Sequence, residues 1–121
     1  MKNTYINSDE RATKFSLEII KLIRRQKYID FALKEIFRQL IRSATSIGAN
    51  IYEAKGGSSR KDFTLFLSHS LKSSIETCYW LNLLKKGYDF EEIDHLIIEC
   101  QQLSKILGKS VMTLRNDKKA S

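Results

Sequence analysis

The sequence predicts an all-α protein, an antiparallel up-down-up-down four-helix bundle formed by a single domain over residues 1–121. The chain has no proline and only 5 glycines, so few positions can interrupt a helix. Apolar residues recur at the three- and four-residue spacing of helix faces over four segments. Connections of about three to five residues separate these segments, and helices joined so closely pack as antiparallel neighbours.

The first helix is expected over about residues 8–27. Ser8 is a suitable N-cap, and the acidic Asp9 and Glu10 that follow favour the positive end of a helix dipole. One face of this segment carries the residues expected in the core: Ala12, Phe15, Ile19, Leu22 and Ile23.

The second helix, over about residues 31–54, is expected to be the centre of the bundle. Residues 39–54 read QLIRSATSIGANIYEA, with apolar or small residues at 40, 44, 47, 48, 51 and 54 on one face. The other faces carry short side chains, such as Ser43 and Ala49, where a solvated helix would carry lysine or glutamate. Short side chains let neighbouring backbones approach, so this helix is predicted to pack on more than one side. Gly56 is expected to end it in the left-handed conformation.

The third and fourth helices begin at similar signals. Ser59 and Asp62 have the spacing of a capping box, which predicts a helix over about residues 59–86. Asp89 and Glu92 repeat that spacing before a helix over about residues 90–114. Residues 115–121 are predicted to be a frayed polar tail.

Several large apolar residues fall outside the predicted core stripes. They are Leu17, Ile20, Leu65, Tyr79, Trp80, Leu83, Ile98 and Ile106. So many would form a second apolar surface, and such surfaces commonly contact a partner. We therefore predict a homo-oligomer with these residues at the subunit interface. The alternative is a wide core stripe that leaves some side chains half exposed.

The net charge of +7 favours anionic partners, nucleic acid before membranes. In an up-down bundle, almost all of this excess falls at the end that holds both termini and the Gly56-Gly57 turn. This predicts RNA or DNA binding through that end face by Lys55, Arg60, Lys61, Arg11, Lys14, Lys109 and Arg115. The alternative is a solvated end whose charges only keep the protein soluble.

No catalytic or metal-binding pattern is present in the sequence. His69 and His95 are isolated, and Cys78 and Cys100 lie on predicted core stripes, where they would act as small buried residues. We therefore expect no metal, no cofactor, no small-molecule substrate and no enzymatic activity. Without an apolar run long enough for a bilayer or a signal peptide, the chain is expected to be cytoplasmic and not bound to a membrane.

Three ordered blocks carry a resemblance to a known family: residues 39–54, residues 59–63 (SRKDF), and residues 70–81, which contain SLK and ETCYWL. Over residues 15–114 the chain closely resembles the four-helix-bundle proteins called 23S ribosomal-RNA intervening-sequence proteins. It is more distantly similar to the accessory proteins of diversity-generating retroelements, which form basic pentamers that bind nucleic acid and a reverse transcriptase. Residues 72–74 (KSS) depart from the Lys-Glu-Ala common in the family.

The resemblance implies a homopentamer with no known enzymatic activity. It also draws attention to four polar residues in the blocks on the two inner helices, for which we expect hydrogen bonding between helices or subunits: Arg42, Asn50, Glu53 and Glu76. The leading functional prediction is a non-enzymatic, oligomeric nucleic-acid-binding protein. The alternative is a protein-interaction scaffold without affinity for nucleic acid.

Overall fold

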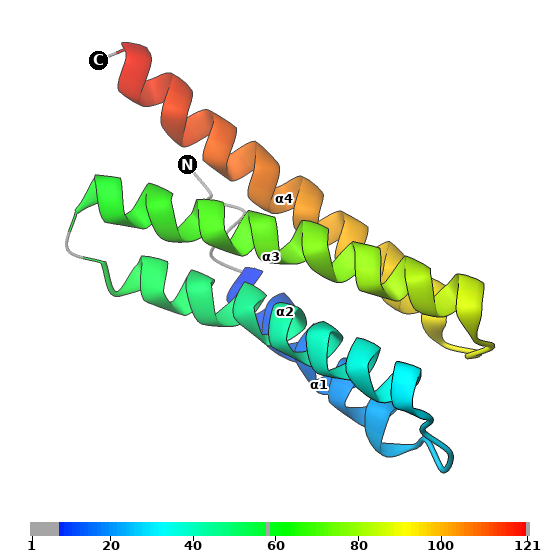
Figure 1. Ribbon diagram of the computed structural model, residues 1–121. Coiled ribbons are helices and arrows are strands. Elements are labelled where there is room, and N and C mark those ends of the chain that lie inside the picture. Colours follow the sequence, from blue (N-terminus) through cyan, green and yellow to red (C-terminus); the bar gives the residue numbers. More distant parts are fainter. Residues whose placement is uncertain (1–7, 58, 121) are drawn as a thin grey trace.

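The computed structural model describes residues 8–57 and 59–120, with side chains described as far as residue 117. These residues form four helices: α1 (Ser8–Arg24), α2 (Phe31–Lys55), α3 (Arg60–Gly87) and α4 (Ile93–Ala120). Consecutive helices run in opposite directions, as Figure 1 shows. The described residues contain no strand, so the predicted all-α four-helix bundle is confirmed.

The four helices surround one core, in which each helix packs against two others. Helix α2 packs against α1 and α3, and α4 packs against α3 and, less extensively, against α1. Helices α1 and α3 are therefore diagonal to each other. The core includes most of the residues predicted from the helix spacing, with Phe15, Ile19 and Leu40 buried, whereas Ile23 is only partly buried.

Small residues bring α2 close to α1. Ala44 is fully buried, and its carbonyl oxygen accepts a hydrogen bond of 3.2 Å from Ser16 Oγ. A Cβ atom built at Gly48 would lie 3.4 Å from Ala12 Cβ, in van der Waals contact, so a side chain larger than that of alanine would crowd the α1 backbone.

Buried hydroxyl groups join α2 to α3 on its other side. Ser70 Oγ donates a hydrogen bond of 2.7 Å to the carbonyl of Ile47, and Thr77 Oγ1 donates one of 2.8 Å to Ser43 Oγ. Both bonds are buried. Among the residues that are described, no buried side-chain nitrogen or oxygen lacks a hydrogen-bond partner. The prediction that α2 packs on more than one side is therefore correct.

Side chains cap the starts of α2 and α3. Ser59 Oγ accepts a hydrogen bond of 3.1 Å from the Asp62 backbone N–H, which confirms the predicted cap of α3. Asp30 caps α2 by accepting from the Leu33 backbone N–H at 2.8 Å. The prediction that Gly56 is left-handed is wrong. Gly56 has φ −86° and ψ −2°, and its N–H group still reaches the carbonyls of Tyr52 and Glu53, so it continues the helical turn.

Two helix boundaries and the predicted tail need correction. Helix α1 ends at Arg24 rather than near residue 27, and α4 begins at Ile93, because residues 90–93 form a preceding turn in which the Ile93 N–H bonds to Phe90. The frayed tail over residues 115–121 was a wrong prediction, since α4 extends to Ala120. No glycine or proline follows Gly108, and Val111 and Leu114 still pack on the core, so nothing ends the helix at residue 114.

Across residues 8–57 and 59–120, no helix combines the length and the apolar character needed to cross a bilayer.

Replacing Ala44 tests whether the close contact between α1 and α2 is required. Ala44→Leu adds three carbons to a fully buried position and should lower the free energy of unfolding by about 1–3 kcal/mol. The matched control is Ala49→Leu, because Ala49 lies exposed on the same helix and should change stability by less than about 0.5 kcal/mol. Urea denaturation followed by circular dichroism measures both. Equal effects of the two substitutions would contradict the packing described for α2.

Candidate nucleic-acid interface

A basic groove lies between the first turns of α3 and the last turns of α4. Its cavity has a volume of about 510 Å³. In Figure 1, the C-terminal half of α4 diverges from α3 at this end of the bundle. The residues that line the groove are Arg60, Lys61, Asp62, Thr64, Leu65, Ser68, His69, Lys72, Leu114 and Arg115. We call this set the basic groove.

Two arginines connect the walls of the basic groove. Arg60, at the start of α3, donates from Nη2 to the carbonyl of Leu114 at 3.3 Å. From α4, Arg115 donates from Nη2 to Ser68 Oγ at 3.2 Å. Arg60 Nη2 also lies 3.7 Å from Asp117 Oδ2. Each guanidinium group is therefore held near the opposite helix while remaining largely in solvent.

The lining of the basic groove is strongly positive. It contains four basic residues and one carboxylate, that of Asp62. Lys61 and Lys72 are exposed. Their long side chains can bring a positively charged ammonium group to an anion in the groove. The N-terminal end of α3 adds the positive end of a helix dipole. Leu65 and Leu114 supply apolar surface between these charges.

Only part of the predicted basic face gathers here. Arg60, Lys61 and Arg115 lie together in the groove, whereas Lys109 and Lys14 are exposed outside it. Lys55 Nζ lies 2.7 Å from Asp9 Oδ2, and its hydrogen bond lowers the pKa of Asp9 below the ordinary value.

Arg11 is engaged in a contact between α1 and α4. Its Nε and Nη2 atoms donate to the two carboxylate oxygens of Glu99 at 3.0 and 2.8 Å, and Nη2 also donates to Gln102 at 2.8 Å. The hydrogen bonds to Glu99 raise the pKa of Arg11. This geometry gives Arg11 a role in joining helices, which the sequence alone did not indicate.

The predicted nucleic-acid-binding set did not include the other seven residues of the groove: Asp62, Thr64, Leu65, Ser68, His69, Lys72 and Leu114. For Leu65, Ser68 and Lys72 a signal existed, because they follow Lys61 at the spacing of one helix face. His69 is exposed, and its ring lies 6.0 Å from the ring of Phe66 in an edge-on arrangement.

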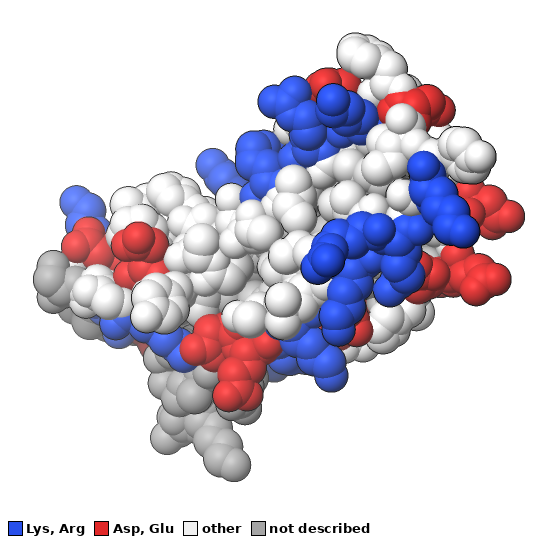
Figure 2. Space-filling view, turned by 90° about the horizontal axis from the view of Figure 1, so that it is seen from below, with Lys and Arg blue, Asp and Glu red and all other residues white. Residues whose placement is uncertain are grey.

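Basic side chains are less concentrated on another side of the bundle than in the basic groove. Figure 2 shows one long face on which Lys and Arg form separate groups, with uncharged surface and acidic side chains between them. That face therefore presents no continuous basic patch.

The residues predicted at a subunit interface differ in exposure. Leu17, Leu65, Tyr79 and Ile98 are 48 to 58% exposed. The remaining four are partly buried: Ile20, Trp80, Leu83 and Ile106. The structure adds exposed apolar residues that the prediction did not include, namely Tyr28, Ile29, Phe31, Tyr52, Ile75 and Met112. Leu65 lines the basic groove, so its exposed side chain belongs to that surface.

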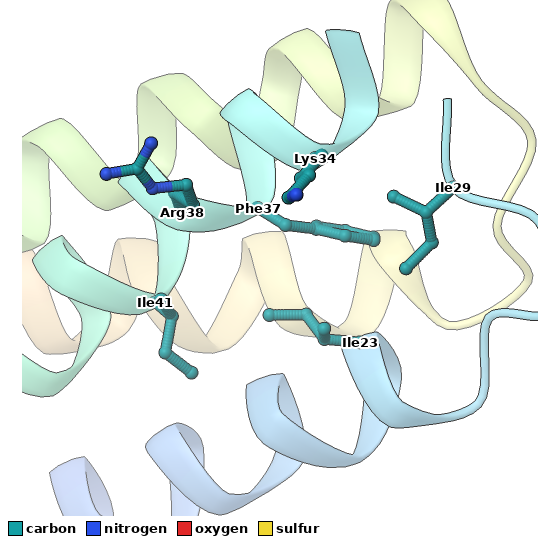
Figure 3. Close-up of a pocket in the computed structure, with 6 residues that line it drawn as sticks. All are labelled: Ile23, Ile29, Lys34, Phe37, Arg38 and Ile41. Atoms are coloured by element: carbon teal, nitrogen blue, oxygen red, sulfur yellow. The ribbon is translucent and has the colours of Figure 1, made fainter. Parts of the chain in front are cut away.

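Two hollows lie along the contact between α1 and α2, and the larger one also has Asp9, Glu10 and Lys14 in its lining. One has a volume of about 240 Å³, and Figure 3 shows Phe37 between Ile23 and Ile29, with Ile41 further along α2. Lys34 and Arg38 lie at its margin (Figure 3). The other, of about 360 Å³, includes Leu17, Gly48 and Tyr52 in its lining.

The four polar residues singled out in the family blocks occupy different environments. Arg42 Nη2 donates to Glu76 Oε2, which joins α2 to α3 at the surface, and Trp80 Nε1 donates to the same oxygen at 2.9 Å. Asn50 bonds within its own helix, to the carbonyl of Ser46 at 2.8 Å. Glu53 is exposed at the end of α2. The expected bridge between helices is therefore formed by Arg42 and Glu76.

The environment of Arg11 predicts an effect on stability. Arg11→Gln should lower the free energy of unfolding by about 1 kcal/mol, because Glu99 loses two hydrogen bonds from one guanidinium group. Lys14→Gln removes the same charge from an exposed position one turn away and should change stability by less than about 0.5 kcal/mol. Thermal and urea unfolding of both variants check this. A larger loss for Lys14→Gln would contradict the role given to Arg11.

Comparison with known proteins agrees with the architecture. Residues 7–109 match the model of the family described as 23S rRNA-intervening sequence protein. Among solved structures, the chain is similar to a protein of unknown function from the S23 ribosomal protein family of Bacteroides thetaiotaomicron. The two share 31% sequence identity with a TM-score of 0.75, over 89% of this chain and 97% of the other. No curated protein matches the sequence. Together with the four-helix fold, these matches show that the chain belongs to the 23S rRNA-intervening sequence protein family.

Proposed function

We propose that this protein is a non-enzymatic nucleic-acid-binding protein that holds the phosphate backbone of RNA or DNA in the basic groove. The observation that carries the proposal is the composition of this one cavity, which has four basic residues and a single carboxylate in its lining. Phosphate contacts from lysine and arginine provide most of the affinity in sequence-independent binding.

The side chains of the groove suit different parts of a nucleic acid. Lys61 and Lys72 are exposed on α3 and can each approach a phosphate of the same strand. Arg115 presents a planar guanidinium group, which binds phosphate oxygens in pairs. Leu65 and the ring of His69 offer surface for a sugar or an unstacked base. The proposed contacts are to phosphates, sugars and base faces, so the binding is proposed to tolerate different sequences.

A double charge reversal tests the groove. Lys61→Glu with Lys72→Glu should weaken binding of a labelled single-stranded RNA by about tenfold or more and reduce the slope of log affinity against log salt by about two. Neither lysine forms an ion pair with another described residue, so folding should be retained. Fluorescence anisotropy between about 50 and 200 mM salt measures both quantities, with DNA of the same sequence in parallel.

The matched control is Lys27→Glu with Lys86→Glu, which makes the same charge change near the opposite end of the bundle, where both lysines are exposed. This control should keep most of the affinity. Equal weakening by both pairs would show that overall charge, and not the groove, drives binding. If the unsubstituted protein binds neither RNA nor DNA, the proposal fails and the scaffold function becomes the better explanation.

The proposal includes self-association, with a homopentamer as the expected form. Exposed Leu17 on α1 and Tyr79 on α3 support it, because these helices are diagonal and their outer sides face away from each other. Contacts between two different faces of identical subunits produce a closed ring when the rotation closes. The hollows between α1 and α2 give one of these faces a shape that another subunit can fill.

Light scattering after size-exclusion chromatography tests the assembly. A pentamer should have about five times the mass of the 14.1 kDa chain. Leu17→Lys with Tyr79→Lys should shift the protein toward the mass of one chain, because a buried unpaired ammonium group opposes association. Ala49→Lys, at an exposed position with little apolar surface, serves as the control and should keep the assembly. A single-chain mass for the unsubstituted protein would remove the ring from the proposal.

The same proposal places the protein in the cytoplasm, in agreement with two cysteines that remain free thiols. Ring assembly would repeat the basic groove around one axis. A long nucleic acid could then contact several grooves at once, and such multivalent contacts raise overall affinity without new types of contact.

A further inference from the structure

Two thiols face each other between α3 and α4, near the middle of both helices. Cys100 Sγ lies 2.8 Å from Cys78 Sγ, and both cysteines are free. A disulfide bond is about 2.05 Å long, so the two sulfur atoms need to approach by less than about 1 Å to become bonded. Cys100 is fully buried, whereas Cys78 is only partly buried.

Serine residues of both helices surround the pair. Cys100 Sγ lies 3.3 Å from the carbonyl oxygen of Ser74, to which it donates. Ser104 Oγ donates to Ser74 Oγ at 2.8 Å and lies 3.9 Å from Cys78 Sγ. The polar network therefore fixes both thiols at the contact between the two helices and gives the partly exposed sulfur a hydroxyl neighbour.

The two cysteines differ in acidity. The hydrogen bond between the two thiols lowers the pKa of Cys78 to about 7, whereas burial acts in the opposite direction. The same hydrogen bond and burial raise the pKa of Cys100. The lowered pKa favours the thiolate form of Cys78 over that of Cys100, and thiolates are the form that reacts with oxidants.

We propose that Cys78 and Cys100 are a redox-sensitive pair that forms a reversible disulfide within one chain on exposure to hydrogen peroxide. This inference rests on the thiol geometry and on no part of the proposed nucleic-acid binding. The partly exposed sulfur of Cys78 is the first to react, and the buried sulfur of Cys100 completes the bond.

The chemistry proceeds in two steps. Cys78 thiolate attacks one peroxide oxygen, the O–O bond breaks, and the released hydroxide takes a proton to become water, leaving a sulfenic acid on Cys78. Cys100 then loses its proton as its sulfur attacks Cys78 Sγ, and the S–O bond breaks to release a second water. The two thiols are oxidised by two electrons in total, and the peroxide is reduced to two waters.

The disulfide would connect α3 to α4 across the turn between them. It closes a loop of about 20 residues, which restricts the unfolded chain and should stabilise the native protein. For a chain of this length we expect the oxidised form to melt about 5–15 °C higher than the reduced form. The link lies on the same two helices as the basic groove, further from its open end.

Mass spectrometry of the full chain after treatment with hydrogen peroxide tests the proposal. The oxidised chain should lose about 2 Da, the mass of two hydrogens. Trypsin should then release residues 73–85 joined to residues 87–105, and dithiothreitol should separate the two peptides and restore the lower melting temperature. Thiols that remain free, or disulfides only between chains, would overturn the proposal.

Two single substitutions distinguish the roles of the sulfurs. In Cys100→Ser, the sulfenic acid on Cys78 has no partner and should be trapped by dimedone. In Cys78→Ser, the buried Cys100 should react at least tenfold more slowly with peroxide. If the two variants react at the same rate, the order of the steps is wrong. The mass measurement on the unsubstituted chain needs neither variant to fold.

Discussion

Helix α2 can pack against α1 and α3 at the same time because its central side chains are short. Ala44 and Gly48 leave room for the α1 backbone, while the buried hydroxyl of Ser43 meets that of Thr77 on α3. Larger residues on these faces of α2 would push α1 or α3 away from it. The closely packed side chains of the interior could not fill the gap between the helices. The arrangement of the other helices depends on this double contact.

The position of the basic groove depends on how α3 packs on α2 and how α4 packs on α3. Ser70 fixes the first half of α3 on α2 through the carbonyl of Ile47. Helix α4 packs on α3 and continues past residue 114, so Arg115 comes within reach of Ser68. Had α4 ended where the sequence suggested, the second wall of the groove would lack this arginine in a helical position. The surface of greatest functional interest is therefore a consequence of helix length as well as of charge.

Structural features that depend on residues close together in the sequence could be predicted. The four apolar stripes, the cap at Ser59 and the crowding around α2 depend on spacing along one helix, and the chain displays that spacing directly. Relations between helices were harder to predict. Nothing local shows that Arg11 meets Glu99, because the two residues are 88 positions apart. For that reason the set of basic residues predicted to bind nucleic acid included some that lie in the groove and others, such as Arg11, that form contacts elsewhere.

Hydrogen exchange measured by mass spectrometry tests the central role of α2 most directly. The slowest amides should lie at about residues 40–51 of α2 and at the facing residues 67–77 of α3, because these segments are buried against each other and α2 is also covered by α1. The first turn of α1 and the last turns of α4 should exchange faster. Exchange of residues 40–51 as rapid as that of the first turn of α1 would contradict the account.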